Sequence, residues 1–294
     1  MRSTSVLLPV LLIVTGMAFT ATGSGLAKLL FPLVGAGGAT TLRLTIAALI
    51  LVAIFRPWRH RLDRKQWRAV LLYGAAMGAM NLFFYAAIEL IPLGIAVALE
   101  FTGPLTVALL GARKPLDFLW IALAVIGFLT LLPWSSTSGD IAPLGILLAL
   151  CAGACWAGYI IFGQRAGTGA GPHIAALGVS TAAIIALPFG VVTAGTTLLD
   201  PAILPLGLGV ALLSSAIPYA LDMLALPHVP ARLFGILMSG QPALAALSGL
   251  IILNETLGLW QIAGMAAIMA ASIGATLTIA RRNQPVIADG PPSA

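Results

Sequence analysis

Apolar segments long enough to cross a lipid bilayer recur along this 294-residue chain, and they restrict its fold more than any other feature. A helix needs about 20 mostly apolar residues to span the hydrocarbon core. Backbone polar groups in hydrocarbon must be paired within their own segment, so we expect such runs to be helices. A sliding hydropathy window predicts ten of them, at residues 6–27, 37–55, 69–88, 93–111, 116–132, 142–162, 174–194, 203–224, 233–253 and 259–280.

The composition excludes a water-soluble protein. Hydrophobic residues make up 60% of the chain and charged residues only 8%, whereas soluble domains carry about 25% charge. The net charge of +6 does not indicate nucleic-acid binding, because the basic residues flank apolar runs and form no single stripe. Lipid headgroups are the partner that this distribution favours. Cys151 and Cys155 lie within one apolar run, which is typical of helix packing and not of a metal site.

The positions of lysine and arginine predict the orientation in the membrane. Alternate connections between the predicted spans contain thirteen of the fifteen basic residues, and the opposite connections contain none. Basic residues concentrate on the cytoplasmic side of bacterial membrane proteins, so both termini are expected in the cytoplasm. The basic set comprises Arg2, Arg56, Arg59, Arg61, Arg64, Lys65, Arg68, Arg113, Lys114, Arg165, Arg232, Arg281 and Arg282.

The two halves of the chain resemble each other at an offset of 137 to 138 residues. Lys28 corresponds to Arg165, Pro104 to Pro242, and Asp117 to Glu255. We therefore expect a first five-helix repeat at 1–137, a second at 138–282 and a cytoplasmic tail at 283–294. An odd number of helices per repeat inverts the second repeat relative to the first, which is the architecture of many secondary transporters. The expected fold class is an all-α polytopic membrane protein.

Glu100 is the most informative charged residue, because it falls near the middle of the fourth predicted span. A carboxylate at that depth costs about 2.5 to 3.5 kcal/mol, so it should face a cavity, meet a cation or carry a proton. Pro104 lacks an N–H and leaves the Glu100 carbonyl without its helical donor. This combination suits a substrate ammonium group or a transported proton. The alternative is a structural glutamate that only fixes helix packing.

Other polar side chains in the spans form a candidate substrate path. Arg43 in the second span could bind a substrate carboxylate or a polar partner in the bundle. Lys28 is a possible gate residue at the outer end of the first span, or it could extend to the headgroups. Neutral hydrogen-bonding groups share helix faces by their spacing. They are Asn81 with Tyr85, Ser215 with Tyr219, and Gln241 in the ninth span.

Proline residues and one further acid complete the candidates. Pro104, Pro218 and Pro242 are predicted to kink their helices and could serve as hinges. Asp222, at the inner end of the eighth span, is a second possible gate, or a hydrated partner of Arg232. The chain contains no zinc-protease, nucleophile-elbow or phosphate-loop motif, so we expect no enzymatic activity, metal or cofactor.

Six segments carry a resemblance to a known family: residues 24–28, 31–36, 92–104, 153–156, 163–167 and 241–246. They resemble the EamA branch of the drug/metabolite transporter superfamily, and within it the bacterial threonine and homoserine exporters. The resemblance covers nearly the whole chain, and residues 92–104 are its most specific part. One departure is that Gln241 precedes Pro242 where this family is expected to have glutamate.

The resemblance implies proton-driven export of small amino acids from the bacterial inner membrane, by alternating access around a cavity between the repeats. In this interpretation Glu100 binds the ammonium group or the proton, and Arg43 the carboxylate. A monomer or weak homodimer is expected. A broader exporter of drugs or toxic metabolites is the first alternative. An intramembrane enzyme and a non-transporting scaffold are the others.

Overall fold

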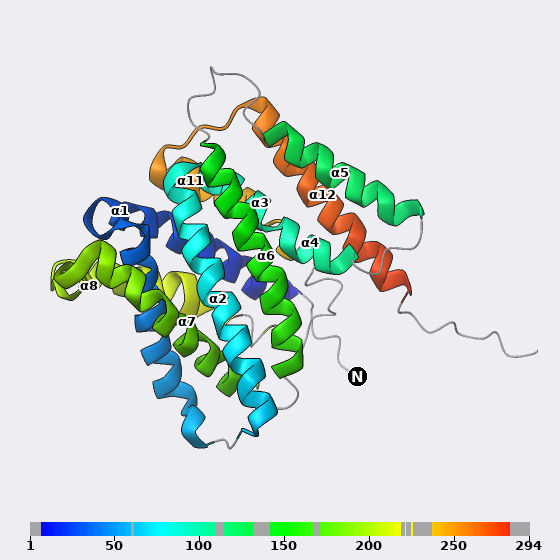
Figure 1. Cartoon of the computed structure of the whole chain (residues 1–294). Coiled ribbons are helices and arrows are strands. Elements are labelled where there is room, and N and C mark those ends of the chain that lie inside the picture. Colours follow the sequence, from blue (N-terminus) through cyan, green and yellow to red (C-terminus); the bar gives the residue numbers. More distant parts are fainter. Residues whose placement is uncertain are drawn as a thin grey trace, which may run out of the picture.

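The computed structural model describes residues 7–59, 62–109, 115–131, 142–166, 171–218 and 237–282, together with Leu221 and Ala225. Every regular element in these ranges is a helix, and no strand occurs among them (Figure 1). The main elements are α1 (Leu7–Phe55), α2 (Arg64–Leu90), α3 (Leu93–Glu100), α4 (Thr102–Leu109), α5 (Pro115–Leu131), α6 (Pro143–Ala166), α7 (Gly171–Ala194), α8 (Leu204–Ala211), a π-helix (Leu212–Ala216), α11 (Gln241–Leu253) and α12 (Leu259–Arg282).

The helices have the length and surface of a polytopic membrane protein. Five described segments are long and apolar enough to span a bilayer, and four shorter apolar helices accompany them. Large apolar side chains cover the outside, including Val192 and Leu259, which are 86% and 84% exposed. Soluble monomers rarely carry extended apolar surfaces of this kind. The predicted class of an all-helical, polytopic membrane protein is therefore confirmed.

Helix α1 corrects the prediction for the first outer connection. The sequence predicted separate spans at 6–27 and 37–55, but Gly35 is the one non-helical residue inside α1, with φ 67° and ψ 172°. Glycine adopts a positive φ without the steric clash that a Cβ causes, so one residue is enough to redirect the chain. The apolar residues before it continue the helix. Lys28 thus lies inside the helix, seven residues before the break, and not at its end.

Local chemistry explains where the other helices begin and end. Asp63 and Gln66 form a reciprocal capping box at the start of α2, with bonds of 2.7 and 2.9 Å. Ile91 is extended because it precedes Pro92, which disfavours helical backbone in its neighbour. Asn254 ends α11 in the left-handed conformation that asparagine tolerates.

The helices pack mainly in pairs that join distant parts of the sequence. α2 packs against α6, α1 against α7 and α8, α3 against α11, and α5 against α12. Figure 1 shows α5 and α12 side by side along one flank of the molecule. The short helix α3 is the most enclosed element, since all eight of its residues are buried. It delivers Glu100, its last residue, to the interior.

The region predicted as one span at 93–111 is two helices separated at Phe101. The Thr102 hydroxyl donates to the Leu99 carbonyl at 2.6 Å across the interruption. Just after it, α4 crosses α6 so closely that a Cβ on Gly103 would overlap the Gly153 carbonyl oxygen. The same crossing brings the Glu100 carbonyl against Gly153. Backbone contact through glycines therefore fixes Glu100 relative to α6.

The other two prolines shape their helices differently from the predicted simple kinks. Ahead of Pro218 the chain widens into the π-helix, and the Ile217 N–H bonds to the Leu212 carbonyl five residues back. Such π-helical turns are common at functional sites. Pro242 lies in the first turn of α11, after a turn at Ser239 and Gly240, so it starts a helix and does not bend one.

Replacing Gly103 with alanine is expected to destabilise the protein, because the added Cβ meets backbone that cannot rotate away. Overpacking of this kind costs about 3 kcal/mol, which would lower the thermal midpoint of the detergent-solubilised protein measured by intrinsic fluorescence. Gly209→Ala is the matched control, because nothing lies within 4 Å of its added Cβ. Equal midpoints for the two variants would contradict the tight crossing.

Candidate functional site

A cavity of about 210 Å³ lies in the helix bundle beside Glu100. Four residues that the sequence singled out from four different helices line it together: Arg43, Asn81, Glu100 and Gln241. The cavity thus combines one cation and one carboxylate with two amides. The remaining lining residues are Thr20, Ala21, Ser24, Met80, Phe84, Val97, Trp156, Tyr159 and Ala245.

Arg43 is held by two neutral groups behind the cavity. Its Nε donates to the Ser215 hydroxyl and its Nη1 donates to the Tyr85 hydroxyl, each at 3.2 Å. The Arg43 guanidinium carbon also lies 5.4 Å from the centroid of the Tyr85 ring. Tyr85 is fully buried and Ser215 lies in the π-helix, so both are fixed. Neither partner neutralises the charge, and the guanidinium keeps donors for an anion.

Glu100 ends α3 and is 7% exposed. Among the described residues, no side chain or backbone group hydrogen bonds to its carboxylate, although the positive charge of Arg43 acts on it. Since buried carboxylates normally find a partner, this group is suited to bind something that enters the cavity. An ammonium group or a proton would satisfy it.

Two amides and two aromatic rings complete the wall. Asn81 donates one N–H to the Met77 carbonyl at 2.8 Å. Its amide oxygen therefore stays available to a ligand. Trp156 packs edge-on against Phe101 with ring centroids 5.3 Å apart, and the Tyr159 ring stacks on Tyr73 at 4.7 Å. The rings are braced by neighbours and give the cavity a stiff apolar side.

The possible gate residues fall elsewhere. Lys28 is not part of the cavity lining, and it pairs with Glu255 at 2.5 Å. Tyr219 and Asp222 lie outside the described residues. Sequence reasoning missed Glu255 as a site residue. The available signal was an acid in a predicted outer loop that otherwise lacks charge, opposite a lysine predicted at the same side of the membrane.

The described residues offer no evident metal site. They contain no group of three or more His, Cys, Asp or Glu side chains that could hold an ion. Cys151 and Cys155 are both free and half-buried in α6, as the packing interpretation of the sequence expected. The residues that line the cavity offer hydrogen bonds and charges of both signs to a ligand.

Comparisons with known proteins agree over almost the full length. The chain matches the EamA-like transporter family at residues 143–277. It is 53% identical over 283 residues to the threonine/homoserine exporter RhtA of Salmonella typhimurium (strain LT2), covering 96% of each chain. It is 50% identical to RhtA of Escherichia coli (strain K12), covering 97% of this chain and 96% of the relative. A crystal structure at 21% identity and TM-score 0.58 covers 97% of this chain and 100% of the other, and it shows the fold alone.

Proposed function

The chain belongs to the EamA-like transporter family, and from this premise we propose that it is a secondary active exporter of threonine, homoserine or a similar small amino acid. It is a multi-pass transporter of the bacterial inner membrane. The substrate is proposed because the names of relatives that are 50 to 53% identical agree with the chemistry of the central cavity.

The observation that carries the proposal is the pairing of opposite charges in a small cavity. An amino acid at neutral pH has a carboxylate and an ammonium group a few bonds apart, and Arg43 and Glu100 offer one complementary charge to each. The volume of about 210 Å³ is below the 300 to 1,000 Å³ of typical drug-sized sites. This size favours a small amino acid over the broader drug or toxic-metabolite exporter.

Each lining residue then has a defined role. Arg43 binds the carboxylate, and Tyr85 and Ser215 orient its guanidinium from behind. Glu100 binds the ammonium group or carries the counter-transported proton. Asn81 and Gln241 hydrogen bond to the substrate side-chain hydroxyl. With glutamine at 241, Glu100 is the one carboxylate among the described lining residues, so proton coupling is assigned to it.

The proposed architecture is ten helices in two inverted repeats, residues 1–137 and 138–282, with both termini and the tail 283–294 in the cytoplasm. Two observations support it. Phe101, between α3 and α4, and Ser239, just before α11, are both turn residues and are 138 residues apart, the same offset as in the sequence. In the proposed repeats α1 corresponds to α6, and α2 corresponds to α8. The contact of α2 with α6 therefore has a counterpart in the contact of α8 with α1, and both are present. Alternating access follows from rocking of such repeats.

Efflux from proteoliposomes loaded with labelled amino acids tests the substrate. We expect efflux of threonine and homoserine, and weaker efflux of valine, which has the shape of threonine without its hydroxyl. A site built to hydrogen bond a hydroxyl discriminates strongly against an analogue that lacks it. Bulky cationic drugs should neither move nor compete. Equal competition by such drugs would indicate the broader exporter, and failure to move any solute would contradict the proposal.

A further inference from the structure

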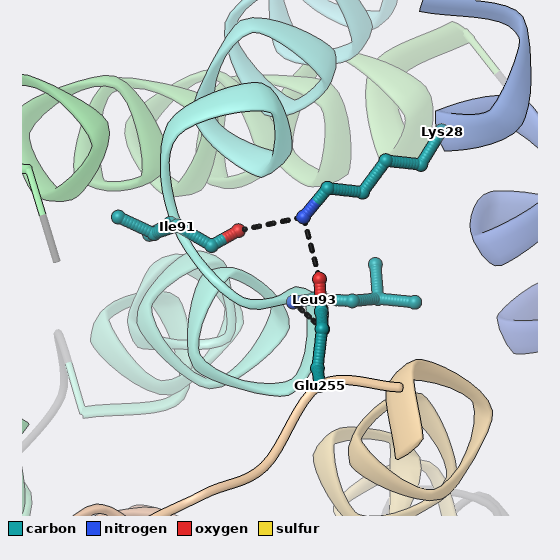
Figure 2. Close-up of polar contacts among 4 residues, drawn as sticks. All are labelled: Lys28, Ile91, Leu93 and Glu255. Carbon is teal, nitrogen blue, oxygen red and sulfur yellow. Dashed lines mark hydrogen bonds and ion pairs between the residues drawn. The ribbon is translucent and has the colours of Figure 1, made fainter. Parts of the chain in front are cut away.

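An ion pair outside the cavity joins the two halves of the chain (Figure 2). The Lys28 Nζ, from α1, donates to Glu255 Oε1 at 2.5 Å and to the Ile91 carbonyl at 3.4 Å. Glu255 lies in the connection between α11 and α12. Lys28, Glu255 and Ile91 come from three segments that are far apart in the sequence. Their contacts hold these segments together.

The second carboxylate oxygen of Glu255 caps the helix that carries Glu100. Its Oε2 accepts from the Leu93 N–H, the first of α3, at 2.8 Å (Figure 2). Carboxylates stabilise helix N-termini, whose first N–H groups have no partner within the helix. The Glu255 N–H in turn donates to the Gly249 carbonyl near the end of α11 at 3.1 Å. Glu255 thus connects Lys28 and the start of α3 through its carboxylate, and the end of α11 through its backbone N–H.

Two spaces lie along α1, and the pair lines one of them. Thr20, Ala21 and Ser24 line the central cavity. Lys28, one helical turn beyond Ser24, lines a separate polar vestibule of about 460 Å³. Glu89 and Glu255 are the carboxylates of this vestibule. The Lys28 and Glu255 side chains are 22% and 15% exposed, so they stand at the boundary between the vestibule and the buried interior.

We propose that Lys28 and Glu255 form the outer gate of the transport path, closed in this structure, and that Glu255 links the gate to the position of Glu100 through α3. Opening requires the pair to separate. Separation also releases the cap on α3, so the helix that presents Glu100 is free to move as the path opens to the outside. This inference rests on the proposed transport function, because a gate requires a transport path. The contacts of Lys28 and Glu255 do not depend on which substrate is transported.

Accessibility of Ser24 tests the gate without any substrate. Ser24→Cys is introduced after Cys151 and Cys155 are replaced by alanine, and spheroplasts are treated with a membrane-impermeant maleimide. With the pair intact we expect slow labelling from outside. Lys28→Met and Glu255→Gln should each raise the labelling rate by about fivefold or more, the range of typical coupling between two conformations. Inverted vesicles report the sidedness.

Matched variants separate the gate from general loosening. Glu89→Gln removes a carboxylate of the same vestibule that is outside the pair, so it should leave labelling unchanged. The exchange Lys28→Glu with Glu255→Lys should return labelling toward the slow rate. Unchanged labelling in Lys28→Met and Glu255→Gln, with normal elution on size exclusion, would overturn the gate. The proposed substrate would stand in that case, because it is tested separately by efflux.

A further comparison tests the link to α3. Glu255→Gln breaks the ion pair but keeps an oxygen that can accept from Leu93, whereas Glu255→Ala loses both. Both variants should label fast, and Glu255→Ala should additionally show slower threonine efflux than Glu255→Gln. Equal efflux by the two variants would show that Glu255 does not act on α3.

Discussion

Glu100→Gln should reduce threonine efflux driven by a pH gradient to the rate measured without the gradient. Glutamine has nearly the shape of glutamate but cannot carry a proton at neutral pH. If one proton is exchanged per substrate, each pH unit across the membrane can sustain about a tenfold ratio of threonine concentrations. The variant should sustain no such ratio. The measurement is efflux from proteoliposomes with an acidic exterior, compared with the same vesicles at equal pH on both sides.

Counterflow then identifies what Glu100 binds. If it carries only the proton, the variant should still exchange labelled for unlabelled threonine without a gradient. If it binds the substrate ammonium group, exchange should be lost together with gradient-driven efflux. Gradient-driven efflux at the wild-type rate would remove Glu100 from the mechanism. Normal elution on size exclusion is required before either loss is interpreted.

Arg43→Gln should raise the KM for threonine efflux by at least tenfold. Truncating one partner of a buried, hydrogen-bonded charge pair costs about 2 to 5 kcal/mol. Without Arg43 the substrate carboxylate would meet no other cation among the described residues that line the cavity. Arg43→Lys should recover only part of the affinity, because one ammonium group cannot reach Ser215, Tyr85 and the substrate with the geometry of a guanidinium.

Tyr85→Phe is the matched control for the Arg43 variants. It removes the hydroxyl that accepts from Arg43 Nη1 and keeps the ring beneath the guanidinium. We expect a KM between those of wild type and Arg43→Gln, with little change in maximal rate. A wild-type KM in Arg43→Gln would show that the substrate carboxylate is bound elsewhere.

Hydropathy and residue chemistry predicted much of the fold. The helical membrane class and the family were predicted from the sequence and are confirmed. Five described segments are long and apolar enough to span a bilayer, and the count of ten spans stays a prediction. Polar side chains within apolar spans are costly unless they have a partner or a function. Four of those selected for this reason line one cavity: Arg43, Asn81, Glu100 and Gln241. The orientation, the repeats and the hinge and gate roles stay predictions.

The errors arose where tertiary packing decides. The break between the spans expected at 6–27 and 37–55 is a single residue, because Gly35 can turn the chain at a positive φ. Sequence spacing paired Tyr85 with Asn81 and Ser215 with Tyr219, but it could not show that Tyr85 and Ser215 both bind Arg43. Lys28 was recognised as a charge at the outer side, but its partner Glu255 is 227 residues away in the chain.

The contact of Gly103 with Gly153 has a mechanical consequence. No side chain lies between two backbones that touch. The distance between α4 and α6 at this crossing therefore cannot change through a change of rotamer. α3 begins at Leu93, and the helix is interrupted at Phe101 before it reaches Gly103. When the end held by Glu255 is displaced, α3 can therefore tilt while the distance between Gly103 and Gly153 stays fixed.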